Sequence, residues 1–82
     1  MQGKCSADQT MDARGLLCPL PVLRARKRLQ AMQTGAVLCL IADDPAAVID
    51  VPHFCAEQGH VLIAQHDDPD DPQARHFLIR KG

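Results

Sequence analysis

The chain has 82 residues and a formal net charge of −1, with 46% hydrophobic residues, 2% aromatic residues and neither Trp nor Tyr. This length predicts one small domain with a surface site, because a core of this size does not enclose a deep substrate cavity. Scarce aromatic rings and a near-neutral charge argue against autonomous RNA recognition, which relies on base stacking and basic surfaces. No apolar run approaches the roughly 20 residues that span a bilayer. The N-terminus does not resemble a signal peptide, so we expect a cytoplasmic location.

The first half of the chain predicts one strand and one helix. Residues 1–9 are polar and aperiodic, which is typical of a flexible leader, so a single domain is expected over residues 10–82. Residues 10–13 favour a short strand that ends at a glycine turn. Apolar side chains recur at helical spacing from Leu20 to Gln33. The apolar positions of this predicted helix are Val22, Ala25, Leu29 and Met32.

The second half predicts three more strands and one helix. Residues 36–42 form a continuous apolar run of strand length and are expected in the centre of the sheet. Residues 46–58 have a helical pattern, but Pro52 has no N–H to donate and predicts a kink or a break. The strands expected at 61–66 and 75–80 are separated by an acidic loop, which indicates a hairpin connection.

The order strand, helix, strand, helix, strand, strand indicates an α+β fold. We expect a two-layer sandwich in which both helices cover one face of a mixed four-stranded sheet. Asp43 and Asp44 precede the second helix and are interpreted as its caps. The loop from Gly15 to Pro19 follows the first strand, so it should lie at the edge of the sheet and expose its cysteine on a rigid support.

Cys18 lies in this loop, directly ahead of the first predicted helix. A helix start offers unpaired N–H groups and the positive end of the macrodipole, and both stabilise a thiolate. Pro19 is expected at the first helical position and Pro21 in the first turn, where they stiffen the chain without breaking the helix. The sequence therefore predicts an exposed nucleophile with a lowered pKa, assisted by the positive charges of Arg14 and Lys81.

The other cysteines predict no second reactive site. Cys39 and Cys55 lie in apolar patterns typical of a core, and Cys5 lies in the predicted leader. No CxxC pair occurs, so neither a disulfide framework nor a dithiol redox motif is indicated. The four histidines are scattered without the ligand spacing of a zinc site, so we expect neither a metal nor a cofactor.

A basic stripe of Arg24, Lys27 and Arg28 lies on the first predicted helix, on the side away from its apolar positions. It begins one turn from Cys18. Two interpretations stay open. The stripe is either a solvated helix face or a docking surface for an acidic partner around the cysteine.

The sequence resembles the TusA (SirA-like) family of small sulfur-carrier proteins, which is marked by a Cys-Pro-x-Pro motif opening the first helix. The motif here is Cys18-Pro19-Leu20-Pro21. Such a short pattern recurs by chance, but further similar segments follow in the right order, so the resemblance covers about residues 10–82. The similar segments are 12–22, 41–46, 50–52 with 54–55, and 78–82.

The resemblance implies a fold with the same element order and a sulfurtransferase role for Cys18. Members of the family accept a sulfane sulfur as a persulfide on the motif cysteine, commonly from a cysteine desulfurase, and pass it to a downstream relay protein. In the tRNA-thiolation branch the final acceptor is the wobble uridine, which becomes 2-thiouridine. We expect a monomer that contacts neither nucleic acid nor membrane directly.

Leu20 departs from the tRNA-thiolation branch, which often has Glu in the middle of the motif. Leucine does not impair the thiol chemistry, but it alters the partner surface, so sulfur relay to molybdenum-cofactor assembly or sulfur oxidation stays open. Two other classes compete with a carrier. A regulatory binding module would leave Cys18 without a use, and a thiol–disulfide redox protein would lack its resolving cysteine.

Overall fold

The computed structural model describes residues 7–82, so Cys5 lies outside the described residues. Its elements are β1 (Gln9–Asp12), α1 (Leu20–Gln30), β2 (Val37–Ala42), α2 (Ala47–Gln58), β3 (Val61–Asp67) and β4 (Arg75–Arg80). Over residues 7–82, no helix is both long enough and apolar enough to cross a membrane.

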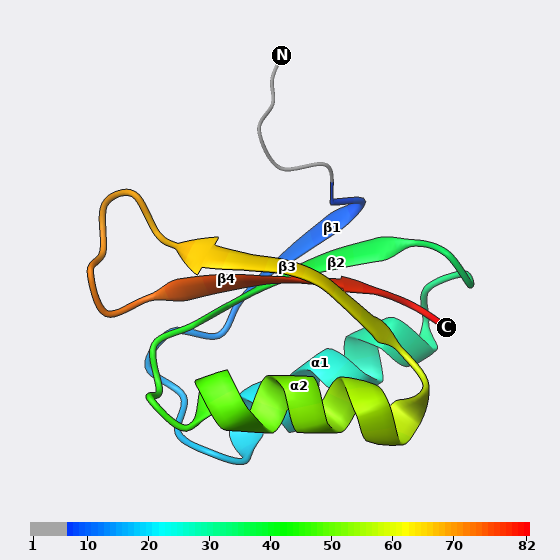
Figure 1. Ribbon diagram of the computed structural model, residues 1–82, viewed down its shortest axis with the longest axis horizontal. Coiled ribbons are helices and arrows are strands. Elements are labelled where there is room, and N and C mark those ends of the chain that lie inside the picture. The colour runs from blue at the N-terminus through cyan, green and yellow to red at the C-terminus, as the bar shows by residue number, and fades with distance from the viewer. Residues whose placement is uncertain (1–6) are drawn as a thin grey trace.

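The four strands form one mixed sheet in the order β1-β2-β4-β3. β1 pairs with β2 in parallel, while β4 pairs antiparallel with both β2 and β3. Figure 1 shows α1 and α2 side by side beneath the sheet, so both helices cover the same face. The predicted two-layer α+β sandwich is confirmed, and β2 is central as its apolar run predicts.

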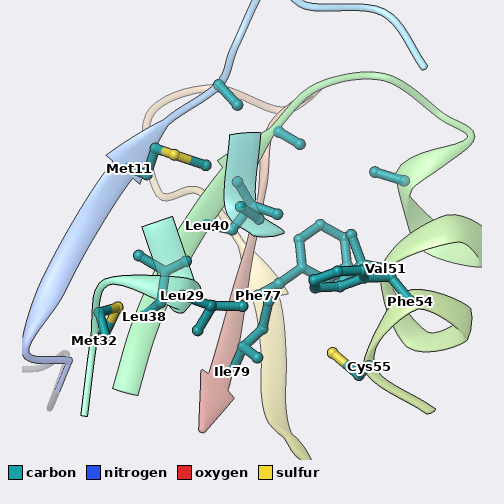
Figure 2. Packing of buried hydrophobic residues seen from close by; sticks show 14 residues of the cluster. Met11, Leu29, Met32, Leu38, Leu40, Val51, Phe54, Cys55, Phe77 and Ile79 are labelled. Atoms are coloured by element: carbon teal, nitrogen blue, oxygen red, sulfur yellow. The ribbon is translucent and has the colours of Figure 1, made fainter. Parts of the chain in front are cut away.

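The core fills the space between the helices and the sheet, as Figure 2 shows. Alternate residues of the central strands face the helices, and Leu38, Leu40, Phe77 and Ile79 are completely buried there. α1 buries Ala25 and Leu29 against them, and α2 buries Val51, Phe54 and Cys55. The apolar face predicted for the first helix is therefore the face that packs on the sheet.

The end of α1 and the start of β1 differ from the sequence prediction, and β2, α2 and β3 each differ from it by one residue at one end. α1 ends at Gln30 instead of Gln33, and the chain then turns through Gly35, whose φ of 91° lies in the left-handed region. β1 begins at Gln9, within the predicted leader, because Asp8 already pairs with Val37. The Asp8 N–H donates to the Val37 carbonyl over 2.8 Å, and its side chain accepts the Val37 N–H.

α2 runs without a break through Pro52, contrary to the predicted interruption. Proline removes a single backbone hydrogen bond, the one to the carbonyl of Val48. The buried side chains of α2 lie on both sides of the proline, from Ala47 to Cys55, so packing on the sheet holds the two halves in one helix.

Candidate thiol site

Cys18 lies in the loop between β1 and α1 and is exposed, as the sequence predicts. α1 begins at Leu20, the first residue of the predicted helical pattern, but Pro19 does not take the position expected of it. Pro19 is the N-cap rather than the first helical residue, Leu20 opens α1, and Pro21 is buried in its first turn. Pro19 gives no side-chain cap to the helix, so the start of α1 is held by the loop and by packing.

Two carboxylates that follow β2 fix this loop. Asp43 Oδ1 accepts the Gly15 N–H over 3.0 Å, and Asp44 Oδ2 accepts the Cys18 N–H. Asp44 Oδ1 also accepts the Ala46 N–H over 3.1 Å in the turn that leads into α2. The N-cap of α2 is Ala46, which has no side-chain cap, so the prediction that Asp43 and Asp44 cap this helix is wrong. Asp43 instead ties the cysteine loop to the end of β2.

The thiol itself contacts α2. Cys18 Sγ donates to Asp50 Oδ2 over 2.8 Å, across 32 positions of sequence. Asp50 belongs to the first turn of α2 and is half-buried. Sequence reasoning gave it no role. Its one signal was its place in the segment at 50–52 that resembles the family.

The pKa of the Cys18 thiol is raised from its ordinary value, which contradicts the predicted lowering. The largest cause is the hydrogen bond to Asp50, followed by partial desolvation of the sulfur and by the negative charges of Asp50 and Asp44. The start of α1 does not reverse this effect. The Cys18 N–H donates to the Asp44 carboxylate, and the negative charges of Asp44 and Asp50 disfavour a thiolate at Cys18.

Arg14 and Lys81, predicted to assist the thiolate, are both bound elsewhere. Arg14 Nη2 lies 2.8 Å from Asp12 Oδ2, and its Nη1 lies 3.7 Å from Asp71 Oδ2. The hydrogen bond from Arg14 lowers the pKa of Asp12 to about 2. Lys81 Nζ donates to the Met32 carbonyl over 2.6 Å, close to the end of α1. The hypothesis that these two cations activate Cys18 is therefore wrong.

A groove of about 190 Å³ opens beside the thiol between α1 and α2. Exposed apolar side chains surround Cys18 along the chain, with Leu17 70% and Leu20 44% exposed. Ile49, next to Asp50, is 74% exposed. Exposed apolar surface of this kind is typical of a protein contact. The groove is lined by Cys18, Pro19, Val22, Asp50, His53, Phe54 and Glu57.

The three residues of the basic stripe lie together on α1 and line one surface hollow with Ala31. Arg24 and Lys27 are exposed, and neither has an ion pair with another residue in the range 7–82. Arg28 is half-buried and donates to Gln9 Oε1 over 3.1 Å. Two positive charges of the stripe thus remain available to a partner.

Cys39 and Cys55 are buried, as their apolar patterns predict, with exposed fractions of 1% and 2%. Burial raises the pKa of Cys55 to about 11, which makes its thiol inert at neutral pH. Cys39 lies on the sheet face away from the helices, with Sγ 3.7 Å from His76 Nδ1. Within residues 7–82, Cys18 is the exposed cysteine.

Fold and site together define a small α+β domain that presents one thiol on a fixed loop at the start of a helix. The sequence model of the family described as "Sulfurtransferase TusA" matches residues 9–81, so the chain belongs to the TusA family. It is also similar to the crystal structure of the SirA-like protein from Desulfitobacterium hafniense. That similarity has a TM-score of 0.70 and 25% sequence identity, and it covers 90% of this chain and 97% of that chain. Membership of this family supports a sulfur-carrier role and sulfur transfer as the activity.

Replacing the Asp44 carboxylate should loosen the thiol loop. Asp44→Ala removes the acceptor of both the Cys18 and the Ala46 N–H groups, so we expect the free energy of unfolding to fall by about 1–2 kcal/mol in urea denaturation. Asp70→Ala is the matched control. Its side chain accepts no hydrogen bond from residues 7–82, so the change should stay within about 0.5 kcal/mol. Equal losses in the two variants would contradict the role given to Asp44.

Proposed function

We propose that the protein is a persulfide carrier in which Cys18 takes a sulfane sulfur from a cysteine desulfurase and relays it to a downstream protein. The observation that carries this proposal is the placement of Cys18. It is an exposed thiol, held by Asp44 and open to a groove, in a chain of the TusA family. The proposal describes a cytoplasmic monomer that meets its partners transiently.

Each transfer is an exchange at sulfur. The Cys18 thiolate attacks the terminal sulfur of the donor's persulfide, a new Sγ–S bond forms, and the donor S–S bond breaks with its electron pair left on the donor sulfur. The acceptor's thiolate later attacks the terminal sulfur carried on Cys18, and Sγ departs as the thiolate. Both steps conserve sulfur and electrons, so no oxidant or reductant is required.

Intact mass after incubation with a cysteine desulfurase and cysteine separates the competing classes of function. A gain of one sulfur atom, removable by a reducing thiol, is expected for a carrier. A regulatory binding module would show no change in mass. A redox protein would lose two hydrogens to a disulfide, for which residues 7–82 offer no exposed second cysteine.

The final acceptor we propose is the wobble uridine of tRNA. Deletion of the gene is then expected to remove 2-thiouridine from the tRNAs that carry it. One observation favours other destinations. Leu20 is 44% exposed beside Cys18, at the position where the tRNA-thiolation branch often has Glu. Unchanged 2-thiouridine, with impaired molybdenum-cofactor assembly or sulfur oxidation, would assign the carrier to one of those routes.

The basic stripe is proposed to dock an acidic surface of the donor or acceptor. Reversing Arg24, Lys27 and Arg28 to Glu should slow sulfur transfer from a desulfurase about tenfold or more at low salt, with a smaller effect at high salt, because charge steers encounter. Alkylation of Cys18 by iodoacetamide, a small neutral reagent, should keep its rate. Equal transfer rates for the variant and the wild type would mean that the stripe is merely a solvated helix face.

A further inference from the structure

Two carboxylates, those of Asp44 and Asp50, accept hydrogen bonds from Cys18. Its Sγ lies 2.8 Å from Asp50 Oδ2, and its N–H is bound by Asp44. The groove beside it carries a further carboxylate on Glu57, with His53 Nε2 at 3.5 Å from that group. A thiolate formed here would face two carboxylates at close range.

No basic side chain of residues 7–82 forms an ion pair with Asp44 or Asp50. Arg14 is bound to Asp12 and Asp71, and Lys81 donates to backbone carbonyls. Sulfur exchange nevertheless needs the thiolate as attacking group. The domain thus places its nucleophile in a setting that keeps the nucleophilic form scarce.

We propose that Asp50 is a positioning residue that holds Cys18 as a protonated, hydrogen-bonded thiol in the undocked protein, and that a sulfur-transfer partner releases it by placing a Lys or Arg side chain against the Asp44–Asp50 pair. This proposal rests on the proposed carrier function and names the chemistry of the partner's contact. Asp50 lines the open groove beside Cys18, and Asp44 lines the small hollow next to it together with Cys18 and Asp50. The negative charge of these two carboxylates complements a cation.

The exchange balances without a further reactant. When the partner's cation offsets the two carboxylates, the Cys18 thiol loses its proton to water. Sγ then bonds to the donor's terminal sulfur, the donor S–S bond breaks, and the donor thiolate takes a proton from water. Away from a partner, the thiol stays protonated and reacts slowly with other electrophiles, in agreement with the raised pKa of Cys18.

The pH dependence of Cys18 alkylation tests the first half of the proposal. Iodoacetamide is used as the probe, and the modified peptide is identified by mass. Asp50→Asn keeps an oxygen near the sulfur and removes the charge. The midpoint of the curve of alkylation rate against pH should therefore move to lower pH, and the alkylation rate at pH 7 should rise about threefold to tenfold. Asp70→Asn removes an equal charge that does not act on Cys18, and its profile should match the wild type.

Small disulfides of different charge test the second half. Cystamine is cationic, 2-hydroxyethyl disulfide is neutral and dithiodiglycolate is anionic, and each forms a mixed disulfide with Cys18 while releasing its other half as a thiol. The rate for each reagent is divided by its rate with Asp50→Asn, which cancels the intrinsic reactivity of the reagent. This ratio should be highest for cystamine, by about threefold or more over the neutral reagent at low salt, and it should fall as salt is added.

An unchanged or higher midpoint in Asp50→Asn, or equal ratios for the three disulfides, would overturn the proposal. The carrier function is judged separately by persulfide loading of the wild type. Normal persulfide loading of the wild type, with an unchanged alkylation midpoint in Asp50→Asn, would refute the role of Asp50 and support the proposed carrier function. A lowered midpoint and a cystamine preference, in a protein that accepts no sulfur, would support the role of Asp50 in holding Cys18 protonated and would refute the proposed carrier function.

Discussion

Cys18→Ser is expected to lose persulfide loading from a cysteine desulfurase completely. A serine hydroxyl forms no persulfide, and Cys18 is the exposed cysteine of residues 7–82. The assay is intact mass after reaction with the desulfurase and cysteine. Because Cys18 is exposed and is not one of the buried core residues, the variant should fold as the wild type does, and circular dichroism should show it.

Cys39→Ser and Cys55→Ser are the matched controls for this loss. Both side chains are buried, with exposed fractions of 1% and 2%, so a desulfurase does not reach them. Each variant should keep loading at the wild-type level as long as it stays folded. Sulfur retained by Cys18→Ser, or lost from a folded Cys39→Ser or Cys55→Ser, would contradict the assignment of Cys18.

Phe77→Ala is expected to lower the free energy of unfolding by about 3–5 kcal/mol, which approaches the whole stability of a small domain. Phe77 is completely buried on central strand β4, within the cluster that α1 and α2 cover. Figure 2 shows the Phe77 side chain among the other buried residues of this cluster, so removing its ring leaves a cavity where the two layers meet. Urea denaturation followed by circular dichroism measures the loss.

Val48→Ala provides the control for the Phe77 substitution. Val48 belongs to α2 and is 49% exposed, so its truncation should change the free energy of unfolding by about 0.5 kcal/mol or less. A cost for Phe77→Ala no larger than that for Val48→Ala would mean that the sheet and helices do not meet at Phe77.

The fold could be predicted because its signals are local. The apolar run of β2, the helical spacing of Val22, Ala25 and Leu29, and the glycine turns each act within a few residues. Pro52 shows where local reasoning ends. It predicts a kink or a break, and the break is wrong because α2 is one continuous helix. The packing of Val51, Phe54 and Cys55 on the sheet offsets one lost hydrogen bond.

The site could be predicted only in part, for the same reason. Cys18 and its prolines are visible in the sequence, but Asp50 lies 32 positions away and reaches the thiol only in the folded chain. The predicted direction of the Cys18 pKa was wrong because the local start of α1 was weighed and the carboxylates of Asp44 and Asp50 were not. A thiol's electrostatics depend on every element packed around it.

Locating the transferred sulfur tests the carrier assignment most directly. The wild-type protein is incubated with a cysteine desulfurase and cysteine, persulfides are blocked with an alkylating reagent, and the peptides are mapped by mass. We expect one additional sulfur on the peptide that contains Cys18 and none elsewhere. Sulfur on the peptides of Cys5, Cys39 or Cys55 instead, or on no peptide, would contradict the account.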